Sequence, residues 1–232
     1  MGTQHLTCVV LNGEYKIAQY GFSNGLPQAT GLDIMHFIEG RDLDEFRRRV
    51  PKLRFLSQEE SEQMNSEYKN YRESLSEEEE NLLYQDYDQS CDDPTPEFLD
   101  RYLSHPFFQL DDLLGPMIIE YVMRYDGPLQ NNISFAGFSL ECEWVYVIDL
   151  DKNQFEVYRG LNKEPVPSEE RFGSFPKENG NWLITPYVSK QLDEYKLCPK
   201  TGDMYYPVKH LTTIDFRFLP DDEEFIELCP EN

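Results

Sequence analysis

The chain has 232 residues, of which 39% are hydrophobic and 14% aromatic, enough to build the core of one domain. Its formal charge of −23 argues against direct binding to nucleic acids or anionic membranes, because both would repel it. No window approaches the roughly 18 apolar residues of a membrane-spanning helix, and no secretory signal is visible over residues 1–11.

The five cysteines are odd in number and widely spaced, a pattern typical of reduced thiols. We therefore expect a cytoplasmic protein without a disulfide framework. They are Cys8, Cys91, Cys142, Cys198 and Cys229.

Residues 6–20 predict a β-hairpin, because Asn12-Gly13 separates two β-rich runs and suits a type I′ turn. The loop from Gly21 to Gly31 follows, and it is either a plain connection or a ligand-binding loop. Its candidate contacts are Gly21, Asn24, Gly25 and Gly31. The glycines lack a phosphate-binding spacing, so no nucleotide cofactor is indicated.

Apolar residues at helical spacing predict two short helices over 32–50, broken near Gly40. Arg47-Arg48-Arg49 is the one basic run. A solvated helix end explains it best, and an anion site is the alternative.

The segment 57–104 is acidic and helical. Residues 57–100 carry fifteen acidic against two basic side chains. Ser57 with Glu60, and Ser76 with Glu79, match the capping box at a helix start. We expect a narrow buried face formed by Met64, Tyr68, Tyr71 and Leu75.

A core helix is predicted from Asp111 to Tyr125, followed by a strand-rich C-terminal half. The expected strands lie at 133–138, in a second hairpin at 142–160, near Trp182, and at 211–219. Residues 221–232 are expected to form a partly loose acidic tail.

No metal site is predicted. Asp149, Asp151 and Asn153 alternate like the start of a calcium loop, but the glycine and glutamate that such a loop requires are missing. Turn chemistry in the second hairpin explains them instead. Cys198 lacks the partners of a zinc knuckle.

The sharpest catalytic candidates are Thr7 and Cys8, with His36 as a possible base. A strand–turn–strand start resembles the layout of amidohydrolases with an N-terminal nucleophile, although neither residue is at the chain end. The favoured alternative for Cys8 is a small buried strand residue.

Residues 12–21, and residues 142–151 with 155–160, resemble an uncharacterised family of soluble fungal and bacterial proteins. In that family the first segment continues into Trp-Asp-Gly-Tyr-Pro, whereas this chain has Phe22-Ser-Asn-Gly-Leu-Pro. The resemblance implies kinship and brings no function with it.

We therefore predict one α+β domain over residues 1–232, with a mainly antiparallel sheet and a helical layer. An αββα sandwich is the alternative. The expected function is a protein-interaction or regulatory protein with a basic protein partner and no cofactor. An amide hydrolase, or a ligand-binding protein using the first hairpin and the glycine loop, is the alternative.

Overall fold

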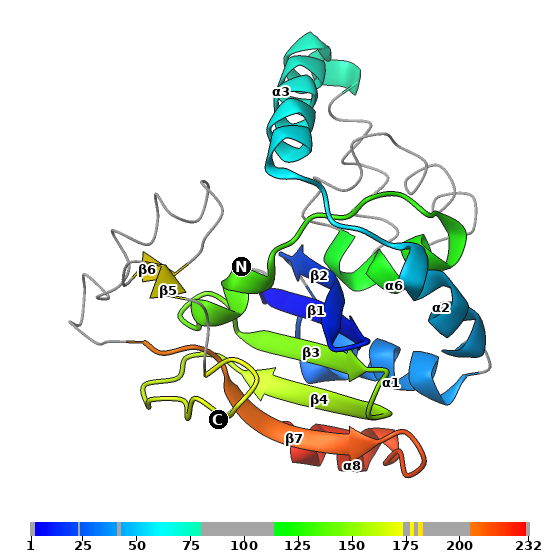
Figure 1. The fold of residues 1–232 in the computed structure, drawn as a ribbon, viewed down its shortest axis with the longest axis vertical. Helices are drawn as coiled ribbons and strands as arrows, with labels where there is room; N and C mark the ends of the chain where they lie inside the picture. Colours follow the sequence, from blue (N-terminus) through cyan, green and yellow to red (C-terminus); the bar gives the residue numbers. More distant parts are fainter. Residues whose placement is uncertain are drawn as a thin grey trace.

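The structure, a computed structural model, describes residues 3–22, 24–40, 43–79, 114–173, 177–178, 181–182 and 205–230. Its central feature is a five-stranded sheet with the order β2-β1-β3-β4-β7 (Figure 1). The strands are β1 His5–Leu11, β2 Glu14–Gly21, β3 Trp144–Asp149, β4 Gln154–Arg159 and β7 Lys209–Asp215. Lys177–Glu178 (β5) and Asn181–Trp182 (β6) form a separate antiparallel pair.

The α+β class is confirmed. β1 pairs with β3 in parallel, and every other pairing within the main sheet is antiparallel. The first hairpin therefore joins the later strands in one sheet, as expected. Within the described residues this is one main sheet and not the two stacked sheets of the alternative sandwich.

Both predicted hairpins are present, and their turns are linked to each other. Asn12 and Gly13 adopt φ values of 57° and 72°, which a type I′ turn requires. Their backbone N–H groups donate to the Asp151 carboxylate, each at 2.8 Å. Asp149 accepts hydrogen bonds from the Asp151 and Lys152 amides, so these carboxylates are turn chemistry, as predicted.

Four helices cover one face of the sheet (Figure 1). They are α1 Leu32–Glu39, α2 Leu43–Arg49, α6 Leu114–Arg124 and α8 Asp222–Leu228. Their apolar residues form one core with Val9, Tyr146 and Phe155 of the sheet. A π-helical turn, Pro27–Gly31 (η1), leads into α1, and a 3₁₀ turn, Val50–Lys52 (η2), follows α2.

The opposite face of the sheet is covered in part by residues 133–138, for which the prediction from the sequence was wrong. Residues 133–138 were expected as a strand, but Ile133–Gly137 forms a 3₁₀ helix (η4). Its apolar residues Phe135 and Ala136 pack with Leu6, Cys8 and other residues of the second core cluster. An apolar run that covers a sheet face has the same composition as a strand within the sheet, so composition could not separate the two.

The C-terminal segment also differs from expectation. Residues 221–232 were predicted as partly loose, whereas α8 is an ordered helix with Asp221 as its N-cap. Phe225 is fully buried and anchors this helix in the core. The strand predicted to Leu219 ends at Asp215, where a turn begins and leaves Phe218 75% exposed.

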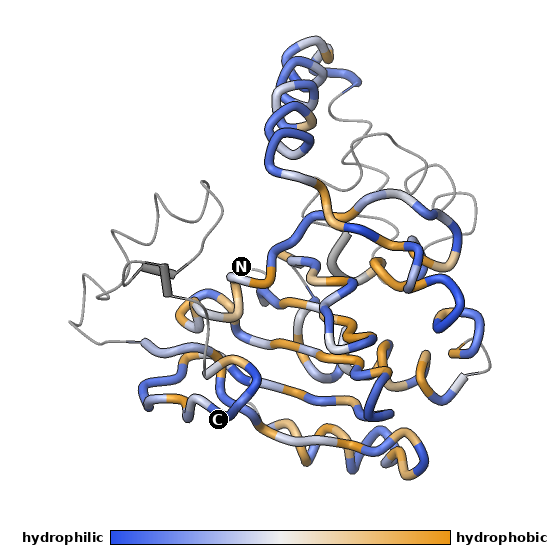
Figure 2. Tube along the Cα trace, viewed as in Figure 1, coloured by the Kyte–Doolittle hydropathy of each residue, from blue (hydrophilic) through white to orange (hydrophobic). Residues whose placement is uncertain are grey.

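Helix α3, Gln58–Ser74, projects away from the sheet (Figure 1). The predicted capping box between Ser57 and Glu60 is present, and so is the one between Ser76 and Glu79. The expected apolar face is only half-buried: Met64, Tyr68, Tyr71 and Leu75 are each partly covered, no residue of α3 is fully buried, and the tube is mostly hydrophilic (Figure 2). The helices expected around Leu82–Leu83 and Phe98–Leu103 lie outside the described residues.

Candidate functional site

The two candidate nucleophiles lie next to each other on β1 and therefore point to opposite faces of the sheet. Cys8 belongs to the core cluster under η4, and Thr7 lies on the face that the four helices cover. Burial raises the pKa of the Cys8 thiol far above its usual range, more than the Arg171 guanidinium lowers it. A thiol held protonated is a poor nucleophile, so Cys8 fits the alternative of a small buried strand residue.

His36 does not meet either nucleophile. It lies on the solvent side of α1, where its Nε2 is 2.8 Å from Asp222 Oδ1 of α8. The Thr7 hydroxyl is buried and has no hydrogen-bond partner among the described residues. The structure therefore does not assemble a nucleophile and a base from these three residues.

The glycine loop packs closely on the protein's own core. A Cβ atom added to Gly21 would lie 2.2 Å from the His5 ring, and one added to Gly31 would lie 2.9 Å from the Phe225 ring. Gly25 leaves no more room, since its Cβ would lie 2.6 Å from Thr3 O. Close packing thus accounts for the absence of side chains at all three positions.

The polar backbone groups of this loop are also largely used within the protein. The Gly25 N–H donates to Thr3 O at 3.1 Å, and the Gly25 carbonyl accepts from the Tyr146 hydroxyl at 2.8 Å. Asn24 adopts a positive φ of 56°, and its carbonyl accepts from the Thr30 hydroxyl at 2.7 Å. The loop has few backbone groups left to offer a ligand, which weakens the case for a ligand site there.

A buried charged network, which we did not predict, lies on the η4 face. The Arg171 guanidinium donates to Asp149 Oδ2 and to both Glu156 oxygens, each at 2.6 Å. The Tyr158 hydroxyl donates to Glu156 Oε2 at 2.5 Å. Arg171 is 15 residues from Glu156 and 22 from Asp149 in a loop without periodicity, so no sequence signal placed it there.

The electrostatics of this network suit a structural clamp. Burial alone would raise the pKa of the Asp149 carboxyl, but backbone and Arg171 hydrogen bonds hold it below its usual value. The pKa of Glu156 is likewise lowered by Arg171 and Tyr158 against the effect of burial. Both carboxylates are therefore ionised and paired, which leaves neither as a free acid or base. The network fastens the loop that carries Arg171 onto the sheet.

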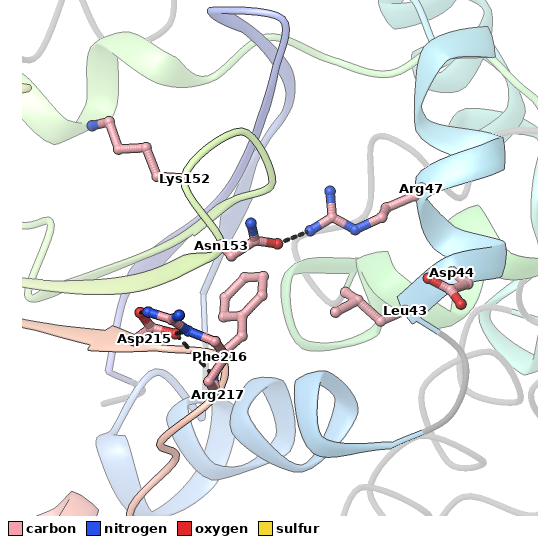
Figure 3. Close-up of a pocket in the computed structure, with 8 residues that line it drawn as sticks. All are labelled: Leu43, Asp44, Arg47, Lys152, Asn153, Asp215, Phe216 and Arg217. Atoms are coloured by element: carbon pink, nitrogen blue, oxygen red, sulfur yellow. Dashed lines mark hydrogen bonds and ion pairs between the residues drawn. The ribbon is translucent and has the colours of Figure 1, made fainter.

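An open pocket of about 570 Å³ lies between α2, the β3–β4 turn and the end of β7 (Figure 3). We call it the α2–β7 pocket. It is lined by Leu43, Asp44, Arg47, Lys152, Asn153, Asp215, Phe216 and Arg217. The lining residues thus place one aromatic ring, basic side chains and acidic side chains around a space that is open to solvent.

An acidic surface follows α3 and the helical residues 77–79 after it. Residues 58–79 carry eight glutamates against Lys69 and Arg72. Five of these glutamates are exposed and form neither an ion pair with a residue that the structure describes nor a capping box. They are Glu59, Glu62, Glu67, Glu77 and Glu78.

Among the described residues, no group of three or more His, Cys, Asp or Glu side chains is arranged to hold a metal ion. Among the same residues, no helix combines the length and the apolar character needed to cross a membrane.

Comparisons with protein-family models, with curated proteins and with solved structures return no match for this chain. The resemblance of residues 12–21 and 142–160 to an uncharacterised family therefore stays a prediction.

Proposed function

We propose that this chain is an interaction protein that binds a basic protein partner through the acidic surface of α3. One observation carries the proposal: no residue of the 17-residue helix α3 is buried, and three glutamates on it and two just after it are exposed and form no ion pair with any described residue. No residue of α3 belongs to either core cluster of the described residues, so its charged surface is available for binding.

The charge of this surface supports a basic partner. Glu59 and Glu62, three positions apart, lie on neighbouring turns of the helix and repel each other. A cationic surface opposite them would remove this repulsion and would be attracted over roughly one Debye length, about 10 Å at 0.1 M salt. Complementary charge of this kind speeds association and selects against acidic partners.

The helix is held in its conformation before any partner arrives. Ser57 and Glu60 bond each other's backbone amides in the capping box, and Arg54 makes two hydrogen bonds of 2.7 Å to the Glu60 carboxylate. Because the helix is already formed, binding does not have to supply the free energy of ordering it. A preformed acidic helix suits recognition better than a disordered acidic tail.

The geometry gives less support to the amide-hydrolase alternative. Cys8 is enclosed as a protonated thiol, and His36 is bonded to Asp222 on the far side of α1. The proposed setting is the cytoplasm, because Cys8, Cys142 and Cys229 are free thiols.

The test compares two variants with the same net charge. The α3 variant carries Glu→Gln at 59, 62, 67, 77 and 78, and the control variant carries Glu→Gln at the exposed positions 39, 169, 223, 224 and 227. Fluorescence anisotropy measures the affinity of each for a lysine- and arginine-rich peptide.

At about 0.3 kcal/mol for each exposed pair, the α3 variant should bind the peptide about tenfold more weakly than the wild type. The control variant should lose clearly less, because its charges lie away from α3, three of them on α8, one on α1 and one in the turn at residue 169. Equal losses in the two variants would show that only net charge matters and would refute a site on α3.

A further inference from the structure

We propose that the α2–β7 pocket binds a small organic anion, with Arg47 holding its phosphate or carboxylate group and Phe216 packing on its apolar part. This site is separate from the acidic surface of α3. The proposal rests on three observations: the hydrogen-bond partners of Arg47, the residues that line the pocket, and the volume of the pocket.

Arg47 is distinguished from its neighbours by its partners. Arg48 is paired with Glu45, and Arg49 is paired with Glu45 and Asp126. Arg47 instead donates to two neutral acceptors, the Leu150 carbonyl at 2.7 Å and Asn153 Oδ1 at 2.6 Å. Among the described residues no carboxylate forms an ion pair with Arg47, so its charge is fixed in place but not neutralised.

A guanidinium held in this way is prepared for an anion. Its five N–H donors lie in one plane, and the two hydrogen bonds within the protein leave others available. The holding contacts also remove much of the side-chain freedom that binding would otherwise cost. Charge-assisted hydrogen bonds from arginine to phosphate or carboxylate are among the strongest that proteins form.

The other charges around the pocket are satisfied or lie away from Arg47. The Arg217 guanidinium donates hydrogen bonds of 2.9 and 2.7 Å to the Asp215 carboxylate, so these two opposite charges compensate each other. Figure 3 shows Lys152 extending away from the pocket, and its Nζ lies 3.4 Å from Asp149 Oδ2. Asp44 also lines the pocket and forms no ion pair with a described residue, but its carboxylate lies on the far side of Leu43 from the Phe216 ring (Figure 3). Of the charges that line the pocket, the Arg47 guanidinium is thus the positive one that no carboxylate of the described residues pairs with.

The remaining walls are apolar and firmly positioned. Leu43 and Phe216 face the pocket from α2 and from the end of β7 (Figure 3), and both also pack against the main core. The Phe216 amide donates to the Asn153 carbonyl at 3.0 Å, which fixes the ring beside the β3–β4 turn. An anion with a flat apolar body would use both parts of this site, whereas an inorganic ion would use only Arg47.

The size agrees with this class of ligand. A volume of about 570 Å³ falls inside the range of about 300–1,000 Å³ typical of small-molecule sites. A phosphate or a carboxylate attached to one aromatic ring fits this space without requiring a change in the fold.

The test uses the whole chain, labelled for NMR, and follows amide chemical shifts during titration with four probes. Phenyl phosphate and benzoate carry an anion on an aromatic ring, inorganic phosphate carries the anion alone, and benzyl alcohol carries the ring alone. Phenyl phosphate or benzoate should shift the amides of Asn153 and Phe216 and bind more tightly than the other two probes. Whichever of these two probes binds more tightly identifies the preferred anionic group, phosphate or carboxylate.

Two variants assign the binding to Arg47. Asn153→Asp keeps the left-handed turn and the contact to Arg47 but neutralises its charge, so affinity should fall at least about tenfold. Arg48→Gln, which changes the same helix outside the pocket, should leave affinity within about twofold. Thermal unfolding of the Asn153→Asp variant checks that its fold is kept.

The proposal is overturned if neither aromatic anion binds, or if benzyl alcohol binds as tightly as they do. It is also overturned if inorganic phosphate matches phenyl phosphate, because the apolar wall would then contribute nothing. Equal effects of Asn153→Asp and Arg48→Gln would remove Arg47 from the site.

Discussion

Replacing Arg171 with methionine should strongly destabilise the protein. The Arg171 side chain is 14% exposed, and those of its partners Asp149 and Glu156 are 3% and 7% exposed. Removing one partner of a buried ion pair leaves charge without compensation, at a cost of about 3–5 kcal/mol. We expect a loss of about 3 kcal/mol in the free energy of unfolding, because Lys152 remains to balance part of the charge.

The loss should depend on pH in a defined direction. In the wild type the folded-state pKa values of Asp149 and Glu156 lie below their usual 3.8 and 4.5. Their contribution to stability is therefore complete above those values and is lost as the pH falls through the lowered ones. Without Arg171, burial becomes the main effect and raises both values, so the folded variant binds protons more readily than its unfolded chain. Its deficit should be largest near about pH 7 and smaller near about pH 5.

Urea denaturation at both pH values measures this difference against the wild type. Arg217→Met is the matched control, because Arg217 also pairs with an aspartate but its side chain is 76% exposed. It should cost no more than about 1 kcal/mol. If both variants cost the same, or if the Arg171→Met deficit does not shrink on acidification, the buried clamp is not the source of stability that we infer.

Three further predictions concern the turns, the glycine loop and the buried thiol. Asp151→Ala removes the acceptors of the Asn12-Gly13 amides, so it should cost about 1–2 kcal/mol and speed hydrogen exchange at that turn; unchanged exchange would contradict the link between the hairpins. Gly31→Ala places a methyl group 2.9 Å from the Phe225 ring, so urea unfolding should show a loss of about 1–3 kcal/mol; equal or greater stability would show that the loop has room there. Because burial raises the pKa of its thiol, Cys8 should react with iodoacetamide only as fast as the chain unfolds. Peptide mapping measures this reaction, and rapid alkylation of the native protein would restore Cys8 as a candidate nucleophile.

The sequence was most informative where local chemistry decides the structure. Asn12-Gly13 and the capping box at Ser57 each depend on residues within one turn, and both are present as predicted. The same local logic predicted the role of Asp149 in its own turn. It could not show that Asp151 binds the first hairpin's turn, because that contact joins residues 139 apart.

The errors come from contacts between distant segments. Phe225 anchors α8 in the core, but from the sequence it was one aromatic residue within an acidic end segment. Residues 133–138 were assigned from composition to the sheet, and only the sheet's need for a cover explains the 3₁₀ helix found there. Arg171 and the pocket around Arg47 belong to the same class, since each depends on elements that meet only in the folded chain.

The central claim is that a basic partner covers α3, and a map of the binding surface tests it most directly. Titration of the labelled chain with the lysine- and arginine-rich peptide should perturb amides concentrated in residues 58–79. Helix α8 is the informative comparison, because Asp222, Glu223, Glu224 and Glu227 make it a second exposed acidic helix. Perturbations centred on α8, or spread evenly over both helices, would contradict the assignment of α3 as the binding surface.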